Sequence, residues 1–137
     1  MMKSVFSYLL VVAACSFSSG AFAASQKIDS LYVDAYGDKS NPAIIFVHGG
    51  PGYDSQDFEF STAVPLSAQG YYVVVYDQRG QGRSDLAQAP TDYSYKQYAD
   101  DLKTIISQLG LTKPVLIGHS HGGPISLKFD QFYPGVA

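Results

Sequence analysis

Three uninterrupted apolar runs constrain the fold of this chain more than any other feature. They are AIIFV at 43–47, YYVVVY at 71–76 and PVLIG at 114–118. Runs of this length without polar alternation are typical of strands buried on both faces of a parallel sheet. A shorter alternating segment, LYVDAY at 31–36, predicts an earlier strand. Because strand patterns alternate with helical ones, we expect an α/β fold in which helices cover a parallel sheet.

A well-marked helix is predicted between the second and third runs. Ser94, followed three residues later by Gln97, is the pattern of a capping box, and Gly110 stands where a left-handed residue ends a helix. The apolar positions between them recur at helical spacing: Tyr98, Leu102, Ile105, Ile106 and Leu109. We expect Asp100 and Asp101 to be solvated residues of its first turns.

The third apolar run leads into GHSHG at 118–122, which fits the G-x-S-x-G pattern of a nucleophile elbow. In such a turn, glycines two residues either side of the serine avoid collisions with the strand and the helix. A helix is expected from Gly122 to about Phe132. Ser120 would then lie at a helix N-terminus, where free N–H groups and the helix dipole favour developing negative charge. Ser120 is therefore the candidate nucleophile.

A glycine-rich loop, HGGPG at 48–52, follows the first apolar run. Its glycines allow the backbone to approach a ligand closely, and its proline stiffens the loop. The N–H groups of Gly50 and His121 are the candidate donors of an oxyanion hole beside Ser120. The alternative is an ordinary Gly-Pro turn. We expect His48 to be structural because it lies behind the loop and not over the serine.

A charged loop, DQRGQGRS at 77–84, follows the second run. Asp77, Arg79 and Arg83 are expected to form ion pairs that hold the loop in shape rather than to take part in catalysis. Its glycines lack the lysine and the spacing of a phosphate-binding loop. No cluster of histidine, cysteine and acidic residues has metal-ligand spacing. We therefore expect no cofactor and no metal.

These three motifs, in this order and at these strand ends, resemble those of the α/β-hydrolase superfamily, and most closely its proline iminopeptidase-like branch. The resemblance covers about 31–136. It implies a doubly wound, mostly parallel sheet of about eight strands, Ser120 as nucleophile, and an oxyanion hole at the Gly50 and His121 amides. The implied reaction is ester or amide hydrolysis through an acyl-serine, on a small ester or a short peptide with an N-terminal aminoacyl or prolyl bond. His121 departs from the branch, which usually has tryptophan or another bulky residue there.

The triad order of this superfamily is serine, acid, histidine. Seventeen residues follow Ser120, and their one acid, Asp130, falls inside the predicted helix. The histidines are at 48, 119 and 121, and the two that flank the serine are expected to point away from its hydroxyl. We therefore expect an N-terminal part of a hydrolase domain (24–137), truncated after the elbow helix and inactive alone.

Two alternatives remain at this point. The chain is a half-enzyme completed by a second chain, or a non-catalytic binding module that keeps the pocket. Relatives with an aspartate nucleophile, such as dehalogenases and epoxide hydrolases, are excluded because position 120 is serine. With the later strands missing, PVLIG is expected to form a bare apolar edge of the sheet.

The first 23 residues have the pattern of a secretory signal peptide. One lysine precedes an apolar run, and Ala21-Phe22-Ala23 fits an A-x-A cleavage site. The alternative is a lipobox at VAAC, with a lipid anchor on Cys15 and no membrane span. We expect export to the periplasm or secretion. The net charge of −3, without a basic block, argues against a nucleic-acid partner.

Overall fold

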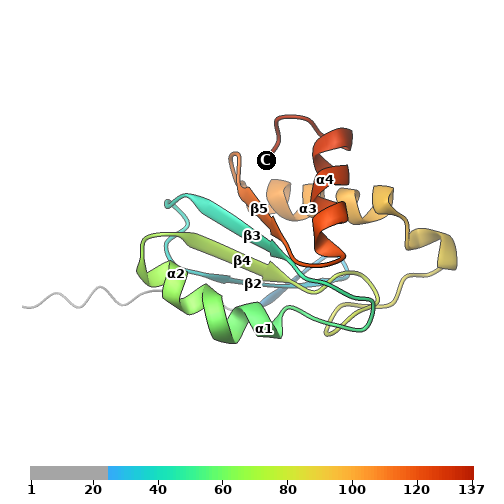
Figure 1. The fold of residues 1–137 in the computed structure, drawn as a ribbon, viewed down its shortest axis with the longest axis horizontal. Helices are drawn as coiled ribbons and strands as arrows, with labels where there is room; N and C mark the ends of the chain where they lie inside the picture. The colour runs from blue at the N-terminus through green and yellow to red at the C-terminus, as the bar shows by residue number, and fades with distance from the viewer. Residues whose placement is uncertain (1–24) are drawn as a thin grey trace, which may run out of the picture.

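The structure, a computed structural model, describes residues 25–137. The predicted signal peptide at 1–23 and the predicted anchor at Cys15 lie outside the described residues. Five strands form one mixed sheet in the order β1-β2-β4-β3-β5 (Figure 1). They are β1 (Gln26–Ile28), β2 (Leu31–Tyr36), β3 (Ala43–Val47), β4 (Tyr72–Tyr76) and β5 (Val115–Gly118). The predicted α/β fold class is confirmed, and each predicted strand is present within a residue of its expected bounds.

The three long apolar runs form the parallel part of the sheet. β3 pairs in parallel with β4 on one side and with β5 on the other, so that Ile45 stands opposite both Val74 and Leu116. β2 pairs with β4 in the antiparallel sense, and β1 pairs with β2 in the same way. All of β4 is buried, as expected for a strand covered on both faces.

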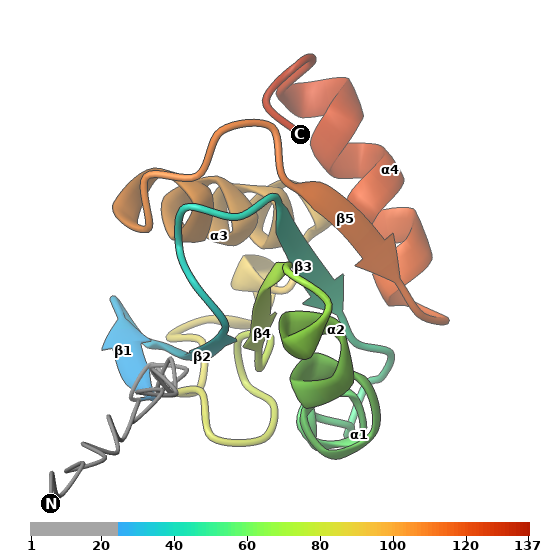
Figure 2. The ribbon, with the colours of Figure 1, turned by 90° about the vertical axis from the view of Figure 1, so that its left-hand side faces the viewer.

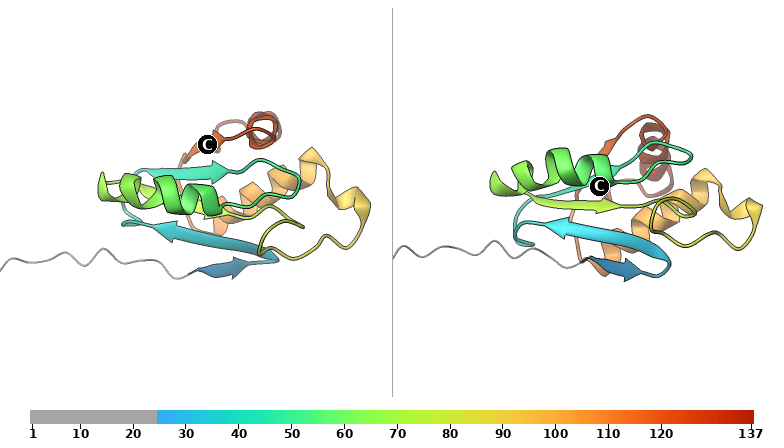
Figure 3. Two further views of the ribbon diagram at one scale, coloured as in Figure 1. Left: turned by 60° about the horizontal axis from the view of Figure 1, so that its bottom comes forward. Right: turned by 90° about the horizontal axis from the view of Figure 1, so that it is seen from below.

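Helices cover both faces of this sheet (Figures 2 and 3). One face carries α3 (Tyr95–Gln108) and α4 (Gly122–Phe132), which also pack against each other. The other face carries a continuous helical segment. It consists of α1 (Gln56–Phe58), the π-helical turn η1 (Glu59–Ala63) and α2 (Val64–Ala68).

Alternate residues of β3 point into two separate cores. Ile45 and Val47 belong to the cluster that packs under α3 and α4. Ile44 and Phe46 pack with Ala63 on the opposite face. Because successive side chains of a strand point to opposite faces, a strand between two helical layers must be apolar at every position. This two-sided burial is the physical reason for the uninterrupted apolar run.

The helix predicted after the second apolar run is α3. The Ser94 hydroxyl accepts a hydrogen bond from the Gln97 N–H at 3.2 Å, so the predicted N-cap is confirmed. Gly110, with φ +63°, follows the last turn, as predicted for the C-terminal end. The predicted apolar face is buried: Tyr98, Leu102, Ile105, Ile106 and Leu109.

The expectation that Asp101 is solvated is wrong. This aspartate is buried and accepts hydrogen bonds from Nε and Nη2 of Arg79, with 2.7 Å between Arg79 Nε and Asp101 Oδ2. Arg79 therefore fastens the loop after β4 to α3, instead of pairing within its own loop. Asp100 is partly exposed and pairs with Lys96, one turn earlier on the helix. The loop between β4 and α3 also contains a short 3-10 helix, η2 (Pro90–Asp92).

β5 forms the outer edge of the sheet in the described part of the chain. Val115 is 59% exposed and Ile117 is 38% exposed. The predicted apolar edge is therefore confirmed for residues 25–137. Among these residues, no helix combines the length and the hydropathy needed to cross a bilayer.

Candidate active site at the carboxyl edge of the sheet

The three candidate motifs meet at one edge of the sheet. HGGPG follows β3, DQRGQGRS follows β4 and GHSHG spans the end of β5 and the start of α4. Because β3, β4 and β5 run in parallel, their carboxyl ends lie side by side (Figure 1). Open α/β sheets bind their ligands at this edge.

The turn between β5 and α4 holds Ser120 in a left-handed conformation, with φ +51°. A Cβ atom at Gly118 would lie 2.4 Å from the carbonyl oxygen of Gly122. A Cβ atom at Gly122 would lie 2.0 Å from the carbonyl oxygen of Val47 in β3. Both predicted steric requirements for glycine are therefore confirmed. A non-glycine residue with positive φ in such a turn is uncommon and marks functional sites.

The glycine-rich loop after β3 comes close to this serine. A Cβ atom at Gly49 would lie 3.0 Å from the Cβ atom of Ser120, so a side chain there would crowd the hydroxyl. Both residues line a cavity of about 380 Å³ that α1 and η1 also wall. The rest of its wall comes from His48, Gly50, Tyr53, Asp54, Asp57, Phe58, Ser61, Thr62 and His119.

One candidate oxyanion donor, His121, follows Ser120 directly in the chain, and the other, Gly50, belongs to the glycine-rich loop. Gly50 lines the same cavity, and His121 is the N-cap residue of α4. Within residues 25–137, neither N–H group donates a hydrogen bond to the backbone. Unpaired N–H groups at a helix N-terminus and in a glycine loop are the groups that can bind a developing negative charge.

The two histidines beside the serine lie against different elements. The His119 ring packs edge-on against Phe58 of α1, with 6.1 Å between ring centroids. The His121 ring packs against Tyr95 and Tyr98 of α3, with centroid distances of 5.5 and 5.8 Å. Aromatic packing therefore fixes both rings on opposite sides of the elbow.

His48 is a structural residue. Its Nε2 accepts a hydrogen bond from the Gln78 N–H at 2.8 Å, so its proton is on Nδ1, which donates to the Gly49 carbonyl at 2.5 Å. Burial lowers the pKa of His48, although the bond to Gly49 opposes this shift. With both ring nitrogens occupied, the neutral imidazole joins the loops after β3 and β4. The predicted structural role is confirmed.

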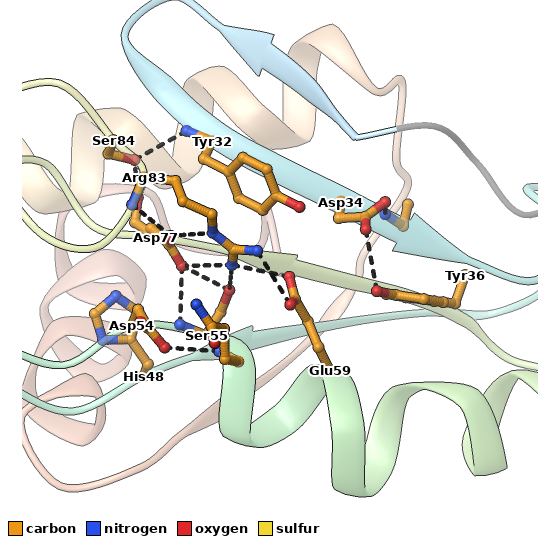
Figure 4. Close-up of polar contacts among 12 residues, drawn as sticks. Tyr32, Asp34, Tyr36, His48, Asp54, Ser55, Glu59, Asp77, Arg83 and Ser84 are labelled. Carbon is orange, nitrogen blue, oxygen red and sulfur yellow. Dashed lines mark hydrogen bonds and ion pairs between the residues drawn. The ribbon is translucent and has the colours of Figure 1, made fainter.

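Asp77 is the centre of a buried polar cluster (Figure 4). It accepts hydrogen bonds from the backbone and side chain of both Ser55 and Arg83, at 2.7 to 3.1 Å. Burial opposes its ionisation, but these bonds outweigh burial and lower the pKa of Asp77 to about 2. Arg83 also pairs with Glu59 and lies 3.6 Å above the Tyr32 ring centroid. The predicted Asp77–Arg83 pair is confirmed. The sequence did not predict that this pair also binds Ser55 and Glu59, at the start of the α1–η1 segment.

Sequence reasoning missed the wall of the cavity formed by α1 and η1. Phe58 stacks on Phe46 of β3 and also contacts His119, so it connects the core to the site. The inward-facing residues Phe58 and Ala63 are five positions apart, which is not the spacing of an α-helix, so the sequence pattern carries no clear signal. Among residues 25–137, no group of three or more potential metal ligands is clustered.

The sheet order, the elbow and the cavity together define an α/β protein of the hydrolase type. A family model described as the α/β hydrolase fold matches residues 42–135. The chain therefore belongs to the α/β-hydrolase fold family, and the predicted family resemblance is confirmed.

Curated relatives agree with this assignment. The chain is 38% identical over 113 residues to a proline iminopeptidase from Saccharolobus solfataricus, covering 78% of this chain and 36% of the relative. It is 35% identical over 107 residues to a bifunctional esterase/perhydrolase from Acinetobacter calcoaceticus, covering 78% and 37%. The chain thus spans little more than a third of the length of these relatives.

A solved structure of epoxide hydrolase A from Mycobacterium thermoresistibile superposes with a TM-score of 0.75. The match covers 83% of this chain and 36% of that one, at 24% identity. At this identity the likeness establishes the shared fold alone.

Proposed function

We propose that this chain carries the nucleophile of a serine hydrolase that cleaves an ester or an amide. The observation that supports this proposal best is Ser120 itself. It stands at positive φ between β5 and α4, on the wall of a cavity that the glycine loop also lines. Its Oγ would attack the substrate carbonyl carbon, while the carbonyl oxygen, becoming negative, would accept hydrogen bonds from the Gly50 and His121 N–H groups.

The reaction also needs a general base, which takes the serine proton and returns it to the leaving alcohol or amine. Water would then hydrolyse the acyl-serine with the help of the same base. His48 has both nitrogens bonded, and the His119 and His121 rings are held by aromatic neighbours. We infer that the base and its acid come from outside residues 25–137. They belong either to a further part of the same polypeptide or to a second chain.

The proposed substrate is a small ester or a short peptide, including one with an N-terminal aminoacyl or prolyl bond. A cavity of about 380 Å³ suits a ligand of this size. A proline iminopeptidase and an esterase among the relatives support the two substrate classes equally. An epoxide hydrolase is disfavoured because position 120 is a serine and not an aspartate.

The direct test is hydrolysis of p-nitrophenyl acetate by the full-length protein as its source cell makes it. A Ser120→Ala variant should lose at least about 1,000-fold in kcat. Ser126→Ala is the matched control, because Ser126 lies on α4 and donates only to the Gly122 carbonyl. Equal activity of the Ser120→Ala variant and the wild type would refute the proposal.

A non-catalytic binding module is the second candidate. The observation that favours it is that each described histidine is held away from a role as base. If the full-length Ser120→Ala variant retains the biological function of the wild type, binding is the function. If that function is lost while the fold is kept, chemistry is the function.

We also propose that the protein is exported. The support is the pattern at 1–23, a short apolar run followed by Ala21-Phe22-Ala23. N-terminal sequencing of the protein from its source cell should begin at residue 24. A lipid-modified N-terminus at Cys15 would instead identify a lipoprotein.

A further inference from the structure

A chain of buried side-chain amides connects the charged loop to the glycine-rich loop. Gln78 Nε2 donates to the His48 carbonyl at 2.5 Å. Gln81 Nε2 donates to Gln78 Oε1 at 3.2 Å. Gln81 Oε1 then accepts from the Gly52 N–H at 2.9 Å. Gln78 and Gln81 are both buried, so each of these bonds replaces a lost bond to water.

The orientation of each amide in this chain is fixed. A backbone carbonyl at His48 only accepts, so Gln78 must present its NH₂ group there and its oxygen to Gln81. A backbone N–H at Gly52 only donates, so Gln81 must present its oxygen there and its NH₂ group to Gln78. The His48 carbonyl and the Gly52 N–H therefore require the same orientation of both amides. If either amide were reversed, at least one of the three hydrogen bonds would be lost.

Gln81 also lies directly against Gly50. A Cβ atom at Gly50 would be 2.3 Å from Gln81 Oε1 and 3.3 Å from its Cδ. Gly50 has φ +148°, a conformation that other residues rarely adopt. A glycine has no side chain to anchor its peptide groups, so its neighbours must hold them. Gln81 does so from two sides, by contact at Gly50 and by a hydrogen bond at Gly52.

We infer that Gln81 is a positioning residue that holds the Gly50 N–H in the direction required of an oxyanion donor. The inference rests on the proposed function, because it assigns a role toward the oxyanion of that reaction. Gln81 is not among the residues that line the cavity. It acts through the backbone of residues 50–52, supported by Gln78. Such donors work only when they are held within about 0.5 Å of the productive geometry.

The test compares Gln81→Met with the wild type in the full-length protein, using p-nitrophenyl acetate. Methionine keeps the length of the side chain and removes both the carbonyl oxygen and the NH₂ group of its amide. An oxyanion bond is made in the transition state, so its loss lowers kcat and leaves KM nearly unchanged. We expect kcat to fall about 10- to 100-fold, less than the loss of a whole donor, and KM to stay within about twofold. Gln108→Met, at an exposed position of α3, is the matched control and should leave both constants unchanged.

Three results would overturn the inference. One is an unchanged kcat in Gln81→Met when Ser120→Ala is inactive. Another is a raised KM with normal kcat, which would assign Gln81 to substrate binding. The third is loss of folding in both Gln81→Met and Gln81→Asn, measured by circular dichroism, which would make the role one of stability alone. Activity that survives Ser120→Ala refutes the proposed function instead, so the two failures are distinguishable.

Discussion

Arg79 and Asp101 form a buried ion pair that fastens the loop after β4 to α3. The guanidinium donates to both carboxylate oxygens, and the two side chains are 14% and 9% exposed. The pair joins residues 22 positions apart, one in the loop after β4 and the other on α3. It therefore holds the charged loop, which in turn carries Gln81, in a fixed place on the core.

Removing one member of this pair is expected to be costly. Asp101→Ala leaves an unpaired guanidinium in a buried place, so the free energy of unfolding should fall by about 3 kcal/mol. The double variant Arg79→Met/Asp101→Leu leaves no buried charge and should lose less than the single variant. Urea denaturation measures both. Lys27→Met is the control, since Lys27 and Asp85 form an exposed pair worth less than about 1 kcal/mol. Equal losses in Asp101→Ala and Lys27→Met would contradict this account.

The elbow glycines should tolerate no side chain. Gly122→Ala places a methyl group 2.0 Å from the Val47 carbonyl oxygen, so strand β3 or helix α4 must move. We expect a loss of about 3 kcal/mol or more in the free energy of unfolding, which is large for one methyl group. Gly123→Ala is the matched control, because its Cβ atom meets nothing within 4 Å. Equal thermal midpoints of the two variants would refute the steric requirement for glycine at position 122.

The positive φ of Ser120 should cost stability in the wild type. Glycine adopts this conformation freely, whereas alanine retains the strain and lacks the hydroxyl. Ser120→Gly should therefore be more stable than Ser120→Ala by about 1 kcal/mol, and both should be inactive. Thermal unfolding of the two variants side by side gives the answer. A less stable glycine variant would mean that the elbow is unstrained.

The lowered pKa of Asp77 should make the free energy of unfolding sensitive to acid. Its pKa in the folded protein, about 2, lies below the ordinary value of 3.8, so protons bind the unfolded chain more readily. Its contribution to stability, about 2 kcal/mol, is complete above pH 4 and is lost as the pH falls toward 2. In Asp77→Asn, the free energy of unfolding should change less between pH 4 and pH 2 than in the wild type. Identical pH profiles of the two proteins would contradict the assignment.

The parts of the fold that sequence alone predicts are those with local patterns. The apolar runs at 43–47 and 71–76 and the helical spacing in 98–109 each reflect burial of neighbouring residues on one element. The elbow is local in part: a side chain at Gly118 would collide with Gly122, four residues later, whereas one at Gly122 would collide with Val47 in β3.

The features that sequence missed depend on partners distant in the chain. Asp101 has the sequence pattern of a surface residue, and only the fold shows that it pairs with Arg79. The role of Gln81 likewise depends on its contact with Gly50, which lies 31 positions earlier in the chain. The segment 56–68 has no clean helical pattern, because Phe60 is 82% exposed and the chain passes through a π-helical turn. Three-residue β1 has too few positions to show an alternation.

The most direct measurement of the central claim is covalent labelling of the full-length protein with a fluorophosphonate, followed by peptide mass mapping. Ser120 should carry the label, and esterase activity should fall in proportion to the labelled fraction. An active protein whose Ser120 stays unmodified, or whose label lies on another residue, would contradict the claim that Ser120 is the nucleophile.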